Sequence, residues 1–282
     1  MILVFGRNGQ LASELHNLAL GATFLGRDRA DLEVPANCAG AIHSHAPSAV
    51  INAAAYTAVD AAEDEEARAN VINGDTPGAM ALSCAELGIP FIQISTDYVF
   101  DGSGEVPFKP DDPIAPENAY GRSKRRGEEQ VMAAGGTYAI LRTSWVFSAH
   151  GNNFVKTMLC LGAERGVLRV VADQIGGPTP ARAIAAACLT IAQGLQGNPH
   201  LSGIYHFSGA PDVSWAGFAR ETISRARLSC RIEDIASSEW PTKAPRPKNS
   251  RLDCSGLERF GLTRPDWRGA LGAVLQELGS SR

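Results

Sequence analysis

The feature that most constrains the fold is the regular alternation of short apolar runs with longer amphipathic segments in the first half of the chain. The apolar runs are residues 1–6, 22–27, 48–55, 89–96 and 137–147. Segments between them, such as 8–20, 67–88 and 119–135, carry apolar side chains at helical spacing. Apolar strands separated by helices are typical of a parallel sheet that helices cover on both faces. The sequence therefore predicts an α/β fold with a Rossmann-type, doubly wound parallel sheet.

Composition fits one large globular unit with a smaller annex. The chain has 282 residues, of which 44% are hydrophobic and 20% are charged. Its formal net charge of -4 gives no basic field for nucleic acid or an anionic membrane. No apolar run approaches the length of a membrane span, and "MILVFG" reads as a strand without a leader pattern. The six cysteines lie far apart, so we expect a cytoplasmic protein with reduced thiols.

A glycine-rich turn connects the first predicted strand to the first predicted helix. It has the pattern Gly6-x-x-Gly9-x-x-Ala12. Gly6 permits a sharp turn, and Gly9 lets backbone N–H groups approach a pyrophosphate at the helix N-terminus. At a βα junction this pattern indicates a dinucleotide cofactor. A tight turn without a ligand is the alternative.

The end of the second predicted strand bears on the choice of cofactor. Sites that prefer NAD usually place Asp or Glu here, where the carboxylate binds the ribose 2′-hydroxyl. This strand ends at Gly26 and Arg27, and a guanidinium at position 27 would pair with a 2′-phosphate. Asp28 lies next to it. The sequence therefore favours NADPH and leaves NADH possible.

The alternation becomes less regular after residue 147. We predict that residues 1–147 form an NAD(P)-binding Rossmann core, to which strands and helices near 168–209 also contribute. Residues 148–282 form the remainder, with a small C-terminal lobe that binds substrate. Within it, the proline-rich and basic segment 241–253 reads as a loop.

A tyrosine and a lysine four positions apart lie in the helix predicted over 119–135. Tyr120 and Lys124 share one face of that helix, and Thr96 ends the preceding strand at the edge where doubly wound folds bind ligands. Reduction of a ketone needs a proton on the oxygen, and an adjacent ammonium lowers the pKa of a phenol. Together with the glycine turn, these residues predict Tyr120 as proton donor, Lys124 as its electrostatic partner and Thr96 as the group that orients the carbonyl.

Six motifs in order along the chain resemble one enzyme family. They are "INAAAYTAVDAAE", "STDYVFDG", "RTSWVF", "GNNFVKTML", "DQIGGPT" and "RPKNSRL". The chain resembles, over nearly its whole length, the dTDP-4-dehydrorhamnose reductases of the extended short-chain dehydrogenase/reductase superfamily. The resemblance implies reduction of the C4 ketone of dTDP-4-dehydro-L-rhamnose to dTDP-L-rhamnose with NADPH or NADH. The product would serve surface polysaccharide such as lipopolysaccharide O-antigen.

The resemblance also implies roles for single residues. Tyr120, Lys124 and Thr96 match its catalytic set, with Tyr120 and Lys124 also at the cofactor. It places these further residues at the cofactor: Gly9, Gln10 and Leu11 on the pyrophosphate, Asp31 and Leu32 beside the adenine, and Ala55, Tyr56 and Thr57 along the channel. Thr96, Asp97 and Trp145 would meet the sugar, although Trp145 could also be a core residue.

Two further expectations concern charged groups. Arg246, Lys248 and Arg251 lie close together in the basic loop, and Arg246 and Arg251 are candidates to bind the substrate diphosphate; a solvated surface is the alternative. The acidic cluster Asp60 and 63–66 is expected to occupy a first helical turn, where carboxylates favour the helix dipole, and no metal site is predicted.

The resemblance raises magnesium and dimerisation, and it leaves other functions open. Some members form dimers around magnesium held by glutamates, and Glu14 matches one such position. Arg182 stands where another glutamate would be and opposes a metal, so a monomer or a homodimer is expected. A nucleotide-sugar epimerase or dehydratase is one alternative, although Tyr98 follows Asp97 where dehydratases have a second acid. A regulatory subunit resembling that of methionine adenosyltransferase is another.

Overall fold

A six-stranded parallel sheet forms the centre of the molecule. The computed structural model describes residues 1–280. The strands of the sheet are β1 (Ile2–Phe5), β2 (Thr23–Leu25), β3 (Ala49–Asn52), β4 (Phe91–Thr96), β5 (Tyr138–Thr143) and β10 (Gly203–His206). Their order is β10-β5-β4-β3-β1-β2, and every neighbouring pair is parallel. The doubly wound α/β fold predicted from the alternation is confirmed.

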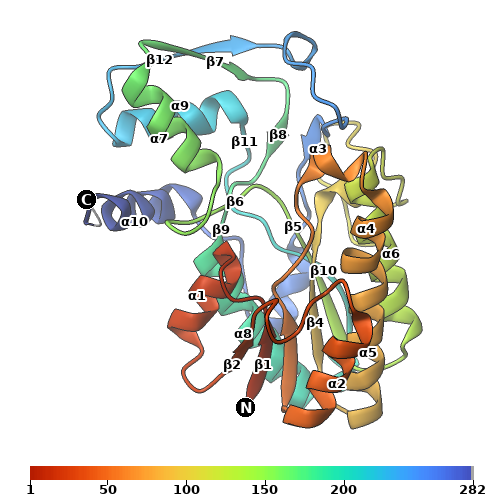
Figure 1. Ribbon diagram of the computed structural model, residues 1–282. Helices are drawn as coiled ribbons and strands as arrows, with labels where there is room; N and C mark the ends of the chain where they lie inside the picture. The colour runs from red at the N-terminus through yellow and green to blue at the C-terminus, as the bar shows by residue number, and fades with distance from the viewer. Residues whose placement is uncertain (281–282) are drawn as a thin grey trace.

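Helices cover both faces of this sheet (Figure 1). On one face lie α1 (Gln10–Leu18) and α8 (Ala181–Gly197). On the other face lie α2 (Pro35–His45), α5 (Thr76–Leu87) and α6 (Ala119–Ala133). Short helices α3 (Val59–Ala62) and α4 (Glu66–Asn70) precede a π-helical turn, Val71–Asp75, that leads directly into α5. Together these helices bury both faces of the sheet.

Alternate side chains of each strand supply the two cores. Val4, Ile51 and Ile92 pack beneath α1 and α8, whereas Leu3 and Val50 pack beneath α2 and α5. Consecutive residues of a strand point to opposite faces, so a run that is apolar throughout is what a sheet covered on both sides requires.

The remaining elements form a smaller lobe, drawn at the top of Figure 1. Its helices are α7 (Phe154–Glu164), α9 (Trp215–Arg225) and α10 (Trp267–Ser280). Its strand pairs are β7 (Val167–Val171) with β12 (Arg231–Ile235), β6 (Val146–Phe147) with β9 (Thr179–Pro180), and β8 (Ile175–Gly176) with both β11 (Val213–Ser214) and β13 (Asn249–Ser250). Short 3₁₀ helices cover Asp97–Val99, Pro199–Leu201, Ser237–Glu239 and Ser255–Phe260. The lobe thus has its own sheets rather than an extension of the main one.

Two expected segments differ in the structure. The run 137–147 is not one strand, because β5 ends at Thr143 and β6 begins at Val146. Between them Trp145 adopts φ 50°, in the left-handed region, which a continuous strand does not allow. The strand that begins at Val167 pairs with β12, so the later contributions to the main sheet and its cover come from β10 and α8.

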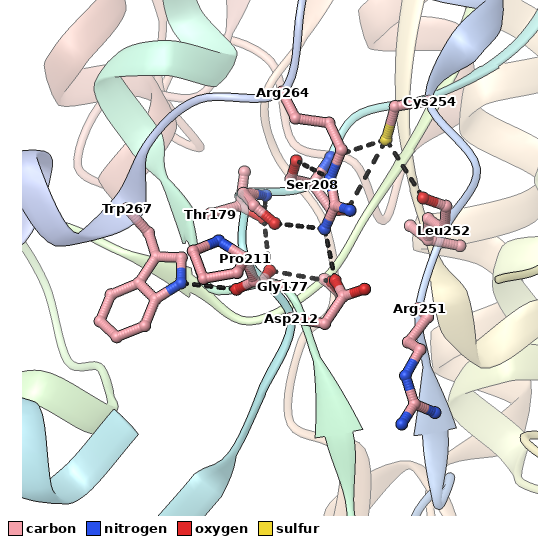
Figure 2. A network of polar contacts seen from close by, with 12 residues as sticks. Gly177, Thr179, Ser208, Pro211, Asp212, Arg251, Leu252, Cys254, Arg264 and Trp267 are labelled. Carbon is pink, nitrogen blue, oxygen red and sulfur yellow. Dashed lines mark hydrogen bonds and ion pairs between the residues drawn. The ribbon is translucent and has the colours of Figure 1, made fainter. Parts of the chain in front are cut away.

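Arg264 connects the chain around β10 to the lobe (Figure 2). Its guanidinium donates to the carbonyl oxygens of Ser208 and Gly209 and forms an ion pair with Asp212. Nearby, the indole N–H of Trp267, the first residue of α10, donates to the carbonyl of Pro211 at 2.7 Å. Polar contacts therefore hold the start of α10 against the segment that leaves the main sheet.

No helix in residues 1–280 has both the length and the apolar character that a membrane crossing needs.

Candidate active site

A cavity of about 1100 Å³ opens along the carboxyl ends of the central strands. Every cofactor and catalytic residue predicted above lines it, together with Asp97 and Trp145 from the substrate set. Those lining residues are Gly6, Gly9, Gln10, Leu11, Arg27, Asp31, Leu32, Ala55, Tyr56, Thr57, Thr96, Asp97, Tyr120, Lys124 and Trp145. The structure thus brings together residues that lie far apart in the chain.

The glycine-rich turn leaves space at the N-terminus of α1. Gly6 has φ 112°, and a Cβ added there would lie 3.3 Å from the carbonyl carbon of Ala53. Gly9 caps the helix, and no atom lies within 4 Å of where its Cβ would be. An open helix N-terminus without side-chain bulk fits the pyrophosphate of a dinucleotide.

The end of β2 presents positive charge to this cavity. Arg27 is largely exposed, and its Nε lies 4.0 Å from Asp31 Oδ1. Arg7 also lines the cavity and packs against Gly26. Sequence reasoning missed Arg7, although its place inside the glycine-rich turn is a usable signal.

Tyr120, Lys124 and Thr96 converge where β4 meets α6. Lys124 is buried, and its Nζ donates to the carbonyl oxygen of Ile94 at 2.6 Å. The Thr96 hydroxyl lies close enough to the Tyr120 phenol to lower its pKa. Thr96 Oγ1 also donates to Asp97 Oδ1 at 3.1 Å. The three side chains surround one point on the cavity wall, as a proton-transfer site requires.

Burial, rather than the charge of Lys124, dominates the pKa of Tyr120 in this structure, and stabilisation of the phenolate by Lys124 stays a prediction. Burial raises the pKa of Tyr120 well above its ordinary value, and the nearby Thr96 hydroxyl lowers it by a smaller amount. Burial also lowers the pKa of Lys124 to about 8, against the opposing effect of Glu128. Because the ammonium of Lys124 is directed at the Ile94 carbonyl, desolvation outweighs charge at the phenol.

The substrate side combines a buried acid with stacked aromatic rings. Burial raises the pKa of Asp97 to about 6, although the hydrogen bond that Thr96 Oγ1 donates to it lowers it. Trp145 stacks on Trp215 of the lobe, with ring centroids 3.6 Å apart. The left-handed backbone of Trp145 turns this side chain toward the cavity wall instead of into either core of the sheet.

Asn73 is a second residue that sequence reasoning missed. It lies in the π-helical turn and is buried. Its Oδ1 accepts from the backbone N–H of Tyr56, and its Nδ2 donates to the Tyr56 carbonyl, both at 2.9 Å. Its Nδ2 also contacts Ser123 Oγ on α6 at 3.0 Å. Asn73 therefore fixes the Tyr56 backbone beside the cavity. No sequence pattern predicts this role of Asn73.

The structure does not place the two predicted diphosphate contacts in the cavity wall. Arg246 forms an ion pair with Asp60 at 2.5 Å and donates to the Tyr98 hydroxyl at 3.3 Å. Arg251 donates to Asn249 Oδ1 at 3.1 Å, and in Figure 2 its guanidinium points away from the Arg264 network. The charge of Arg246 is thus already engaged within the protein.

The carboxylates that raised the question of metal have other partners. Four of them form ion pairs: Asp60 with Arg246, Asp64 with Lys243, Glu65 with Arg68, and Glu66 with Arg122. The fifth, Glu63, accepts a hydrogen bond from the backbone N–H of Ala119 at 2.8 Å. Glu14 lies 3.5 Å from Arg182 Nη1 and 3.9 Å from His150 Nε2. The guanidinium of Arg182 beside Glu14 does not fit a magnesium site, and residues 1–280 contain no cluster of His, Cys, Asp and Glu suited to a metal.

The chain is similar along its length to proteins of one family. The family model of the RmlD substrate binding domain matches residues 1–280. A dTDP-4-dehydrorhamnose reductase of Burkholderia thailandensis is 44% identical, over 98% of both chains. A solved dTDP-4-dehydrorhamnose reductase of Clostridium acetobutylicum superposes with a TM-score of 0.91 at 33% identity, over 99% of both chains. That of Bacillus anthracis, solved in complex with NADP, gives 0.90 at 33% identity, over 98% of both chains.

These matches extend over the core and the lobe alike, and not only over the dinucleotide-binding half. More distant neighbours, such as a UDP-glucose 4-epimerase of Thermus thermophilus at 16% identity and a TM-score of 0.78, share the fold. The chain therefore belongs to the family of the RmlD substrate binding domain.

Proposed function

We propose that the protein reduces the C4 ketone of dTDP-4-dehydro-L-rhamnose to dTDP-L-rhamnose with NADPH. The observation that carries the proposal is the convergence of Tyr120, Lys124 and Thr96 on a cavity that a glycine-rich turn closes at one end. The relatives that carry this activity in their names match the whole chain. The enzyme would act in the cytoplasm and supply rhamnose for surface polysaccharide.

The chain's own residues place the proton. NADPH, when bound, supplies the hydride that the carbonyl carbon receives. Thr96 holds the ketone oxygen beside the phenol, and Tyr120 donates its proton to that oxygen. The phenolate left behind is stabilised by the positive charge of Lys124 and regains a proton from solvent. Asp97 and Trp145 would hold the sugar, since both line the cavity next to Thr96.

Positive charge around the end of β2 supports NADPH over NADH. Arg7 and Arg27 both line this end of the cavity, and Gly26 provides no carboxylate for the 2′-hydroxyl. Asp28 and Asp31 are close by, so NADH would bind more weakly rather than be excluded.

We propose that Arg246 and Arg251 of the basic loop bind the diphosphate of the sugar nucleotide. Arg251 requires only release from the amide oxygen of Asn249, whereas Arg246 would have to leave the carboxylate of Asp60. Removing one partner of an ion pair is costly when the other stays partly buried. Arg251 is therefore the stronger of the two candidates.

The test is oxidation of NADPH by purified protein with and without dTDP-4-dehydro-L-rhamnose, with identification of the sugar product. We expect oxidation that depends on the sugar and yields dTDP-L-rhamnose. Sugar-dependent loss of water or epimerisation without net NADPH oxidation would contradict the proposal. NADPH binding without turnover would instead favour a regulatory protein.

A further inference from the structure

Three side chains on one face of α6 contact β4 at consecutive turns. Tyr120 meets Thr96, Lys124 Nζ donates to Ile94, and Glu128 Oε1 accepts from Ser95 Oγ at 2.5 Å. The first two contacts belong to the catalytic set. The third lies one helical turn further along, and the mechanism above does not use it.

Glu128 is half of a fully buried ion pair. Arg142 on β5 donates to both carboxylate oxygens, from Nε to Oε1 at 2.9 Å and from Nη2 to Oε2 at 2.7 Å. The side chains of Arg142 and Glu128 are 0% and 1% exposed. A buried ion pair is costly to desolvate, and replacing it with apolar residues is often neutral or stabilising, so stability alone is a weak reason for its presence.

The pair is fixed by further contacts to neighbouring strands and loops. Arg142 Nη1 donates to the carbonyl of Pro110 at 3.0 Å and lies 3.3 Å from His206 Nε2 on β10. The Arg142 guanidinium also lies over the Phe100 ring. Ser95 and Arg142 thus hold the carboxylate of Glu128 one helical turn from Lys124, and the contacts of Arg142 fix the guanidinium in turn.

We propose that Glu128 and Arg142 are positioning residues that hold α6 in register with β4 and set the electrostatic environment in which Lys124 stays charged. The carboxylate acts on the ammonium one helical turn away, and the guanidinium partly offsets it. Burial alone drives Lys124 toward its neutral form, and Glu128 opposes that effect. The inference rests on the proposed reductase function only for its kinetic consequence.

Other ionisable groups near Lys124 do not substitute for Glu128. His206 is uncharged near neutral pH, because burial and Arg142 lower its pKa to about 3. The ionisable side chains around Lys124, on α6, β5, β10 and the cavity wall, are Tyr56, Asp97, Tyr120, Glu128, Arg142 and His206. Among them, Glu128 is the one whose charge raises the pKa of Lys124.

The test measures the protonation of Lys124 directly and needs no substrate. The chain has five lysines, which are Lys109, Lys124, Lys156, Lys243 and Lys248. NMR titration of the protein labelled with ¹³C at lysine Cε would give each pKa, with Lys124→Arg assigning the signal. We expect Glu128→Gln to lower the pKa of Lys124 by about one unit, the size of a neighbouring-charge effect. Arg142→Gln should raise it.

Controls separate charge from folding. Glu129→Gln removes the neighbouring glutamate, which pairs with Arg125 on the solvent face of α6, and should leave the Lys124 signal unchanged. The double variant Glu128→Gln/Arg142→Gln leaves no unpaired charge in the core. The carboxylate is the charge nearer to Lys124. In the double variant the pKa of Lys124 should therefore be lower than in the wild type but higher than in Glu128→Gln. The double variant alone is a sufficient test if neither single variant folds.

The direction of the change in the Lys124 pKa predicts how kcat depends on pH. Lys124 loses its charge as pH rises through its pKa, so kcat should fall on the alkaline side, and at lower pH in Glu128→Gln. An unchanged Lys124 pKa in a folded Glu128→Gln variant, or in a folded double variant when that one alone folds, would overturn the inference. So would shifts of the same sign in both single variants. A wild type that does not reduce the sugar would refute the proposed function, while the titration would still decide the role of Glu128.

Discussion

Burial at Tyr120 opposes the phenolate that proton donation leaves behind. Burial is the main cause that raises the pKa of the phenol, and the negative charge of Asp97 adds to it, while the nearby Thr96 hydroxyl lowers it. A buried phenol keeps its proton until a substrate oxygen that is gaining negative charge can take it. At the scale of a single residue, the site thus holds a donor that is protonated over the whole physiological pH range.

Replacing Tyr120 with Phe removes the proton and keeps the ring. We expect kcat to fall by roughly 10²–10⁴-fold, the usual contribution of general acid catalysis, with NADPH affinity preserved. Steady-state kinetics and a fluorescence titration of NADPH would measure the two effects. Tyr138→Phe, at the opposite end of β5 from the cavity, should retain activity. Residual turnover above a tenth of wild type would rule out Tyr120 as the proton donor.

Asp97 should destabilise the protein at neutral pH. Its folded pKa of about 6 exceeds the unfolded value of 3.8, so the folded state holds the proton more tightly. The charged carboxylate therefore costs about 3 kcal/mol above pH 6, and this cost disappears as pH falls through 6 toward 4. We expect Asp97→Asn to raise the free energy of unfolding at pH 7 and to have little effect near pH 4, as measured by urea denaturation. A gain that persists unchanged at pH 4 would contradict this explanation.

Arg27 should contribute to the choice between the two nicotinamide cofactors. We expect Arg27→Ala to lower the NADPH/NADH ratio of kcat/KM by about fivefold, since an exposed cation contributes ~1 kcal/mol. The ratio would be measured with both cofactors at fixed sugar concentration. Arg29, two positions along and outside the cavity lining, offers a matched Arg29→Ala control that should leave the ratio unchanged. A ratio that Arg27→Ala does not move would exclude contact with the 2′-phosphate.

At the scale of elements, glycines let α6 approach its neighbours closely enough to present the catalytic pair. A Cβ at Gly121 would lie 2.2 Å from the carbonyl oxygen of Tyr98. One at Gly127 would lie 2.1 Å from that of Asn73, in the π-helical turn. Asn73 in turn holds Tyr56 beside the cavity. Helix α6 and the π-helical turn therefore form one unit, and its close backbone contact depends on residues without side chains.

This close contact predicts whether a Gly→Ala substitution raises or lowers the free energy of unfolding. Alanine normally stabilises a helix relative to glycine. We expect Gly127→Ala to lower the free energy of unfolding by about 1–3 kcal/mol, because the methyl group forces two backbones apart. In contrast, Gly40→Ala in α2 meets nothing within 4 Å and should stabilise by about 0.5–1 kcal/mol. Denaturant unfolding of both variants checks the comparison, and a stabilising Gly127→Ala would refute the packing argument.

At the scale of the whole molecule, the cavity depends on how the lobe sits on the core. Trp145 lies between β5 of the core and β6 of the lobe, and it stacks on Trp215 at the start of α9. The Arg264 network fixes the segment that leaves the main sheet at β10 and enters the lobe. The placement of the aromatic wall is thus a property of the assembled molecule.

Disrupting this junction should cost more than an exposed ion pair of the lobe. We expect Arg264→Met to lower the free energy of unfolding by about 2–3 kcal/mol, since it removes charge-assisted hydrogen bonds in a partly buried site. Arg220→Met, which breaks an exposed pair with Asp234, should cost less than about 1 kcal/mol. Thermal unfolding followed by circular dichroism would compare the variants. Equal losses would show that Arg264 does not stabilise the junction.

The sequence by itself determined the parallel sheet, the glycine-rich turn and the shared face of Tyr120 and Lys124. These features follow from local rules, namely the period of apolar residues, the backbone freedom of glycine and the four-residue spacing of a helix. The same rules placed the glycine-rich turn, Arg27, Thr96, Tyr120 and Lys124 at the edge where the carboxyl ends of parallel strands meet, and the family resemblance supplied the other cavity residues named in advance.

Only the tertiary structure decided the rest. It ended β5 at Thr143, paired β7 with β12 and engaged Arg246 with Asp60. It also placed Glu128 and Arg142 together beneath Lys124 and set the direction of the Tyr120 pKa. Each of these outcomes depends on groups that are distant in sequence and on how far burial removes them from water. Sequence spacing shows which side chains can share a face, whereas only packing decides which charges meet and how much desolvation they undergo.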